Sequence, residues 1–159
     1  TVINLKAISS LLNQRNIPNV LYSALNVENV TNHYDVEKAK KEYENSVVLL
    51  AGGIGKPNFT TDTCAALRAV ELDAELILAG KYGVKGVYDK DPRLYKDAKF
   101  LKKLTYQEVL DMDLKVMDKT AISLLLHSNV ITKVFSMDDM NNFILAIEDK
   151  DIGTIIKEK

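Results

Sequence analysis

The chain has 159 residues, 47% hydrophobic and 27% charged, a composition that indicates a globular domain with a sizeable core and excludes a disordered chain. Lysine and arginine number 21 against 22 aspartates and glutamates, so the net charge of −1 provides no general field to attract nucleic acid or an anionic membrane. No apolar run approaches the ~18 residues of a membrane span, and residues 1–10 lack the order of a signal peptide, so we expect a cytoplasmic protein that binds any phosphate through local groups.

The cysteine and histidine side chains argue against a metal centre. Cys64 is the only cysteine, so an intrachain disulfide is impossible, and its alanine- and leucine-rich surroundings predict a small buried residue. His33 and His127 lie far apart in the sequence and lack the spacing of metal ligands. We therefore predict no metal-binding residues in this chain.

Hydrophobic periodicity in the first half predicts alternating helices and strands. The expected elements are a helix over 2–12, a strand over 19–25, a helix over 35–45, a strand over 47–53, a helix over 62–72 and a strand over 75–80. The run VVLLAGG at 47–53 is almost continuously apolar, as expected of a parallel strand that is buried on both faces. With the helix and strand that follow, it predicts a right-handed parallel crossover.

The second half continues the alternation. Thr105 and Glu108 have the spacing of a capping box, which predicts a short helix starting there. Beyond it we expect a helix over 114–128, a strand over 131–136, a helix introduced by a second cap in SMDD at 136–139, and an edge strand with a charged tail over 153–159. Because no linker-like segment interrupts these elements, they predict a single α/β domain over residues 1–159 with a mainly parallel sheet.

The segment AGGIGKPNFTTDT, residues 51–63, places glycines, a Thr-Thr-Asp group and a helix directly after an apolar strand. Glycines let the backbone approach a ligand closely, and the helix start offers free N–H groups and the positive end of its dipole, so the segment suits a phosphate. It is not a P-loop, because Pro57 stands where that motif needs serine or threonine. The alternative is a glycine-rich turn, capped by Thr61 or Asp62, that binds nothing.

A second candidate is KYGVKGVYDKDP, residues 81–92, which follows the next predicted strand. Open α/β sheets bind ligands at the carboxyl ends of their strands, and a tyrosine ring can stack on a nucleobase. We therefore expect this loop and the glycine-rich one to open on the same edge. The alternative is a polar surface turn in which Asp89, Asp91 and Pro92 set the bend.

Asp118 is the third candidate. It lies in LKVMDKTA, beside the apolar side of the predicted helix over 114–128, where a carboxylate could orient lysines around a phosphate. The alternative is a solvated carboxylate that the helix dipole favours. The sequence pattern alone favours this second interpretation.

At these residues the chain resembles the bacterial UMP kinases of the amino acid kinase superfamily, and the resemblance covers almost its whole length. The segments that carry it are AGGIGKPNFTTDTCAALRAVEL, GVYDKDP and LTYQEVLDMDLKVMDKTA. The resemblance implies a three-layer α/β/α sandwich, a homohexamer, ATP with Mg²⁺ as phosphoryl donor and UMP as acceptor. It also implies a role in pyrimidine nucleotide synthesis in a bacterial cytoplasm.

By position, the resemblance also implies site residues. UMP would be bound by Ile54, Gly55, Lys56, Pro57, Asn58, Phe59, Thr60 and Thr61. ATP would be bound by Tyr82, Tyr88 and Asp91. Asp118 would organise the catalytic lysines, and we add Asp62, which begins the helix beneath the UMP loop, as a second catalytic candidate.

The family's early K-x-S-G and G-G-G-N motifs do not occur in this sequence. Phosphoryl transfer depends on positioning and on charge stabilisation, which those motifs would supply, so we expect the chain to correspond to the C-terminal two-thirds of such a kinase and to be inactive alone. Two alternatives stay open. One is another amino acid kinase that phosphorylates a carboxylate, against which the GKPNFTTD loop argues; the other is a non-catalytic nucleotide-binding fragment.

Overall fold

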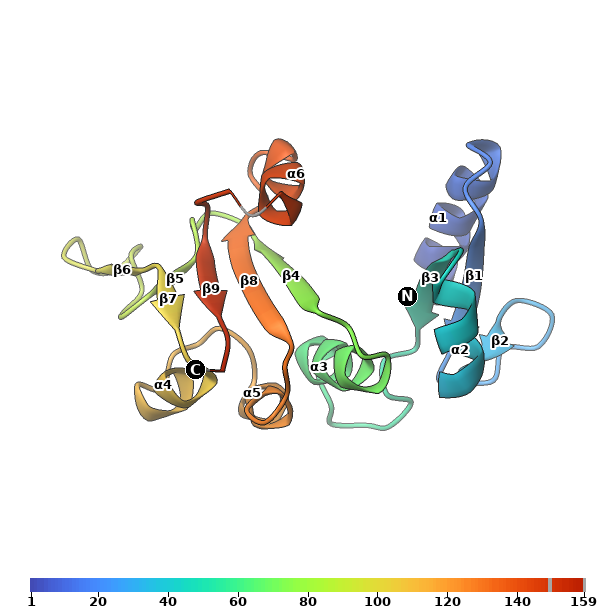
Figure 1. Ribbon diagram of the computed structural model, residues 1–159, viewed down its shortest axis with the longest axis horizontal. Coiled ribbons are helices and arrows are strands. Elements are labelled where there is room, and N and C mark those ends of the chain that lie inside the picture. The colour runs from blue at the N-terminus through green and yellow to red at the C-terminus, as the bar shows by residue number, and fades with distance from the viewer. Residues whose placement is uncertain (149, 159) are drawn as a thin grey trace. The chain divides into compact units, whose positions relative to one another are not determined.

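The computed structural model describes residues 1–148 and 150–158, and it divides into two compact units, Thr1–Cys64 and Ala65–Lys159 (Figure 1). The first unit contains α1 (Val2–Gln14), β1 (Asn19–Ser23), β2 (Asn32–His33), α2 (Val36–Tyr43) and β3 (Val47–Ala51). The next helix, α3 (Thr61–Glu71), begins in the first unit and continues into the second.

Three parallel strands form the sheet of the first unit, in the order β2-β1-β3. Helix α1 contacts β1 and β3, and α2 contacts β3. The charged segment becomes helical after Asp35, whose carboxylate accepts a hydrogen bond of 2.9 Å from the Lys38 N–H and so satisfies a free donor of the first turn. The predicted helices and strands of this unit are therefore confirmed, and the two-residue β2 is an addition.

Strand β3 is less buried than its apolar sequence predicts. Ala51 is the one buried residue among its 5, and Val47 is 42% exposed. Within the described residues β3 has a single strand partner, β1, whereas β4 (Leu76–Lys81) pairs with β8 (Ile131–Ser136). Because β3 and β4 belong to different units and are not hydrogen-bonded to each other in the described residues, the parallel crossover between them stays a prediction.

The second unit contains the remaining elements. They are β4, β5 (Val87–Tyr88), β6 (Phe100–Leu101), β7 (Lys103–Leu104), α4 (Tyr106–Asp111), α5 (Lys119–Leu125), β8, α6 (Asn141–Ile147) and β9 (Thr154–Ile156). Its main sheet has the order β4-β8-β9-β7, and β5 and β6 form a separate antiparallel pair. Figure 1 shows β8 between β4 and β9, with α6 near the end of β8 and α5 near its start.

Strand β8 is the centre of this unit because both of its faces are buried. Val134 belongs to the hydrophobic core, whereas Phe135 faces the other way and packs edge-on against Phe143 of α6, with 5.0 Å between ring centroids. The core also receives buried residues from α3, α4, α5 and β9: Ala66, Ala69, Tyr106, Val109, Ala121, Ile122, Leu125 and Ile156. The predicted α/β class with mainly parallel strand pairing is confirmed.

Strand β9 is an internal strand, so its prediction as an edge strand is wrong. It lies between β8, to which it is antiparallel, and β7, to which it is parallel. Thr154 and Ile156 have no exposed surface. The sequence suggested an edge because charges follow the strand, but burial is decided by the distant partners; the last residue of the expected tail, Lys159, lies outside the described residues.

Helix α5 is shorter than predicted and begins at Lys119. The segment before it is not helical, although it contributes Leu114, Val116 and Met117 to the core. Because these buried residues are apolar, their pattern imitates the apolar side of a helix. Asp118 has an extended backbone, and its Oδ1 accepts hydrogen bonds from the N–H groups of Thr120 and Ala121 at 2.9 and 3.0 Å. Asp118 is thus the N-cap that starts α5.

Other local expectations are partly met. The capping box predicted for Thr105 and Glu108 is present at the start of α4.

Cys64 is half-buried, so the prediction that it is buried is too strong. Among the helices of the described residues, none is both long and apolar enough to cross a bilayer.

Candidate functional site

The glycine loop, residues 51–63, turns through several left-handed backbone positions. Gly52, Gly53 and Gly55 have φ angles of +76°, +61° and +77°, and Asn58 has +66°. Glycine reaches such angles without steric cost, and asparagine tolerates them better than most residues. The glycines therefore serve the tight course of the loop after β3.

Two of these glycines are also required by close packing against the end of β1. A Cβ on Gly55 would lie 2.9 Å from the carbonyl oxygen of Ala24, and one on Gly52 would lie 3.0 Å from the Ser23 Oγ. Around Gly53, by contrast, no atom lies within 4 Å of a Cβ position. Gly53 thus keeps one face of the loop backbone open, as close approach of a ligand requires.

The cap of α3 differs from the sequence prediction. The Thr60 hydroxyl accepts a hydrogen bond of 3.2 Å from the Thr63 N–H, so the cap is Thr60 rather than Thr61 or Asp62. The loop side chains from Lys56 to Thr61 are exposed, and Phe59 keeps 51% of its surface. These side chains are accessible to a ligand, while Asp62 sits half-buried in the first helical turn.

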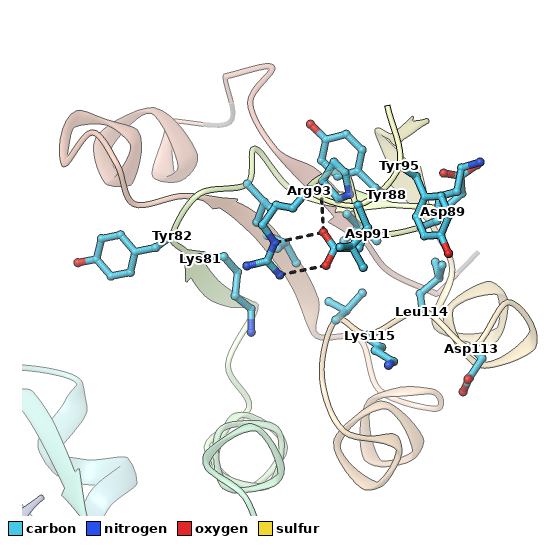
Figure 2. Close-up of a pocket in the computed structure, with 18 residues that line it drawn as sticks. Lys81, Tyr82, Tyr88, Asp89, Asp91, Arg93, Tyr95, Asp113, Leu114 and Lys115 are labelled. Carbon is cyan, nitrogen blue, oxygen red and sulfur yellow. Dashed lines mark hydrogen bonds and ion pairs between the residues drawn. The ribbon is translucent and has the colours of Figure 1, made fainter. Parts of the chain in front are cut away.

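The tyrosine loop, residues 81–92, forms one wall of a pocket of about 630 Å³ in the second unit (Figure 2). Tyr82, Tyr88 and Asp91, which the resemblance assigns to ATP, all line this pocket. Further charged and aromatic side chains in the lining are Lys81, Asp89, Lys90, Arg93, Tyr95, Asp113 and Lys115. The lining thus combines four cations and three tyrosines with three carboxylates. The cations suit the phosphates of a ligand, and the tyrosines suit a planar ring.

Asp91 and Arg93 form a paired contact in this wall. The Arg93 Nε lies 3.1 Å from the Asp91 Oδ1 and its second guanidinium nitrogen lies 3.2 Å from Oδ2, as the dashed lines in Figure 2 show. The Arg93 backbone N–H also donates to Asp91 Oδ1, at 2.9 Å. The hydrogen bond from the Arg93 side chain, followed by that from its backbone, lowers the pKa of the Asp91 carboxyl.

The two tyrosines of the loop differ in how firmly they are held. Tyr88 lies in β5, half-buried, and packs edge-on against Phe100 at 5.4 Å between ring centroids. The neighbouring Val87 N–H donates to the buried Thr154 hydroxyl at 2.9 Å, which ties β5 to β9. Tyr82 is 73% exposed, and Figure 2 shows its ring pointing away from Asp91 and Arg93.

The structure thus brings together one group of the candidates. Tyr82, Tyr88 and Asp91 surround one pocket, whereas Asp118 is not among its lining residues and instead caps α5. The residues of the glycine loop, and Asp62 with them, belong to the first unit.

Sequence reasoning missed two cations of the pocket. Arg93 could have been found from the Asp-Pro-Arg spacing, because a turn places residues two apart within reach of one carboxylate. Lys115 enters the lining from a non-helical segment whose apolar pattern predicts the start of a helix. No local pattern marks its position.

Comparison with known proteins identifies the family. The profile described as "Amino acid kinase family" matches residues 1–136. The chain belongs to the amino acid kinase family. The uridylate kinase of Mycoplasma capricolum is 44% identical to this kinase-family chain over 159 residues, which cover 99% of the chain and 67% of that protein.

Solved structures agree with this assignment. The crystal structure of UMP kinase from Ureaplasma parvum matches with a TM-score of 0.92 at 36% identity, covering 99% of this amino acid kinase chain and 68% of the other. The UMP kinase from Bacillus anthracis matches with a TM-score of 0.94 at 29% identity, covering 100% and 66%. The chain therefore shares their fold and spans about two thirds of their length, and the family resemblance seen in the sequence is confirmed.

Proposed function

We propose that this protein is a UMP kinase that transfers the γ-phosphoryl group of ATP to UMP. The observation that carries the proposal is the 44% identity to a uridylate kinase over a stretch that includes both the glycine loop and the tyrosine loop. The proposal includes a role in pyrimidine nucleotide biosynthesis, a cytoplasmic location and a homohexameric assembly, all of which come from the family resemblance.

ATP is proposed to occupy the pocket of the tyrosine loop. The volume of this pocket, about 630 Å³, lies in the range of ordinary small-molecule sites. Tyr88, held by Phe100, offers an aromatic surface to the adenine, and Asp91 offers a carboxylate to a ribose hydroxyl. Lys81, Arg93 and Lys115 supply positive charge that favours the phosphates.

UMP is proposed to bind the glycine loop. The open backbone at Gly53 and the exposed hydroxyls of Thr60 and Thr61 offer hydrogen bonds to a phosphate or a sugar. The start of α3, which has 11 residues, adds N–H groups and the positive end of its dipole. The contribution of the chain to catalysis is then to orient acceptor and donor and to balance charge.

Mg²⁺ bound to the donor phosphates belongs to the proposal. Within the described residues, no three His, Cys, Asp or Glu side chains form a group that could hold a metal ion. A complete set of protein ligands is not required for Mg²⁺, which proteins commonly hold through one or two carboxylates and the phosphates of the substrate. When bound, the ion neutralises charge on the transferring phosphoryl group; Asp89, Asp91 and Asp113 are the carboxylates on the pocket wall.

The decisive experiment measures ADP release with ATP and Mg²⁺ in the presence of UMP, CMP, AMP, glutamate or aspartate. It compares the protein of full natural length with the 159-residue chain. We expect the full-length protein to use UMP and the 159-residue chain to be inactive. Activity with an amino acid alone would show that the protein is a kinase that phosphorylates a carboxylate. Turnover by the 159-residue chain would contradict the expectation that catalysis needs the K-x-S-G and G-G-G-N motifs.

A further inference from the structure

The tyrosine loop begins with a turn that local packing does not explain. Tyr82, directly after β4, is largely exposed, and Gly83 has a left-handed φ of +72°. A Cβ on Gly83 would meet no atom within 4 Å, so nothing crowds the turn into this shape. Steric crowding therefore does not set the conformation at Gly83, and its hydrogen bonds are the contacts that restrain the turn.

The hydrogen-bond partner of Gly83 comes from the loop after β8. The Gly83 N–H donates to both carboxylate oxygens of Asp138, at 3.1 Å to Oδ1 and 3.2 Å to Oδ2. The two residues are 55 positions apart in the sequence and meet because β4 and β8 are parallel neighbours whose ends adjoin. A charged acceptor makes this a stronger bond than one between neutral groups.

Asp138 is itself held in place. The Ser136 Oγ donates to the Asp138 Oδ2 at 2.8 Å and accepts from the Asp138 N–H at 3.0 Å. The intervening Met137 donates its N–H to the Lys81 carbonyl at 2.8 Å. Its side chain fills the space above Gly80, where a Cβ would collide with the Met137 side chain. Residues 136–138 therefore form a fixed support beneath the start of the tyrosine loop.

The cap that the sequence predicts in SMDD at 136–139 is wrong, because Ser136 ends β8 and the N-cap of α6 is Met140, which makes no side-chain cap hydrogen bond. The N–H of Asn141, the first residue of α6, donates to Asp139 Oδ1 at 2.9 Å. Asp138 makes its side-chain contacts with Ser136 and Gly83 instead. The two adjacent aspartates thus serve different segments, Asp139 the helix and Asp138 the loop.

We propose that Asp138 is a positioning residue of the donor pocket, which acts through the Gly83 N–H to fix the turn that carries Tyr82 and follows Lys81. The proposal rests on the proposed function in that ATP is the occupant of the pocket. Loss of the carboxylate frees the turn, so part of the binding energy of ATP is spent on ordering it. Binding of UMP does not depend on this turn.

The test compares Asp138→Ala with the matched control Asp139→Ala and the conservative Asp138→Asn, all in the protein of full natural length. We expect Asp138→Ala to raise the KM for ATP about three- to tenfold, while kcat and the KM for UMP stay within about twofold. Asp139→Ala should leave the KM for ATP unchanged. Asp138→Asn should restore most of the ATP affinity, because an amide oxygen can still accept from the Gly83 N–H.

Amide hydrogen exchange provides a readout that does not require activity. Asp138→Ala should accelerate exchange in a peptide covering residues 82–88, and Asp139→Ala should do so only at the start of α6. If the wild-type protein is inactive but the variants show this exchange pattern, the proposed kinase function is wrong, whereas the anchoring of the loop by Asp138 is supported. An active Asp138→Ala enzyme with an unchanged KM for ATP would overturn the inference, as would an equal rise in both KM values. If Asp138→Ala does not fold, Ser136→Ala, which removes the hydroxyl that holds the Asp138 carboxylate, takes its place as the loss variant, with Asp138→Asn as its conservative control.

Discussion

At the scale of single residues, the Asp91–Arg93 pair links a proposed ATP ligand to pH. Arg93 lowers the pKa of Asp91 below its ordinary value of 3.8, so the pair favours the folded loop above that value and loses its contribution as the pH falls through the lowered pKa. Replacing Arg93 with alanine removes the main cause of the shift. We expect Arg93→Ala to raise the Asp91 pKa, as measured by NMR titration of the carboxyl carbon.

Lys90→Ala is the matched control for this titration. Lys90 lines the same pocket but pairs with Asp97, at 2.6 Å, rather than with Asp91. Its removal should leave the Asp91 titration where it is. A titration of Asp91 that Arg93→Ala does not move would contradict the role assigned to the guanidinium.

Thr60 and Thr61 can be separated because only one of them caps α3. Thr60 accepts from the Thr63 N–H, so Thr60→Ala should cost about 1 kcal/mol of stability. Thr61→Ala leaves the cap intact and should instead raise the KM for UMP more than that for ATP, in steady-state assays of the full-length protein. Equal effects on both substrates would remove Thr61 from the proposed UMP site.

Asp118 presents a conflict between its structural role and the catalytic role that the resemblance implies. Asparagine caps helices about as well as aspartate, so Asp118→Asn removes the charge and keeps the hydrogen bonds to Thr120 and Ala121. We expect Asp118→Asn to lower kcat with little change in the thermal midpoint or the KM for UMP. Unaltered turnover would leave Asp118 as an N-cap alone, and Asp118→Ala, which also loses the cap, shows by comparison how large the stability effect is.

At the scale of elements, one buried hydroxyl joins β5 and β6 to β9. The Thr154 Oγ accepts from the Val87 N–H at 2.9 Å and donates to the Leu101 carbonyl at 2.6 Å, with no exposed surface. Valine at position 154 would leave the Val87 N–H and the Leu101 carbonyl without the hydroxyl. We therefore expect Thr154→Val to lower the free energy of unfolding, measured with urea, by about 1–3 kcal/mol. Thr154→Ser retains the hydroxyl and should cost less; equal losses would assign the effect to the methyl group.

The elements also show what sequence can and cannot predict. The capping box at Thr105 and Glu108 was predictable because all its contacts lie within one turn. The internal place of β9 was not, since it depends on partners as distant as Lys103 and Leu104. In the pocket, the loop with Asp91 was predictable from its place after a strand, whereas Lys115 enters from a segment whose apolar pattern imitated a helix.

At the scale of the whole molecule, the two units differ in how much apolar surface they bury. The hydrophobic core cluster lies entirely within the second unit, from Ala66 to Ile156. In the first unit, no residue of α1, which the structure describes completely, is buried, and Leu11 is 50% exposed. Segments with few buried apolar contacts open at lower free energy, so the two units should differ in local stability.

Amide hydrogen exchange on the 159-residue chain tests this difference. After correction for intrinsic rates, we expect exchange in β8 to be at least about tenfold slower than in β3, because opening β8 exposes the core. Ile122→Ala, which removes a core side chain that is 1% exposed, should cost about 2–5 kcal/mol and accelerate exchange in β8. If amide exchange in β3 accelerates to the same extent, the two units unfold as one cooperative body, and the expected difference in local stability is wrong. If exchange in β3 is unchanged, the second unit unfolds independently of the first.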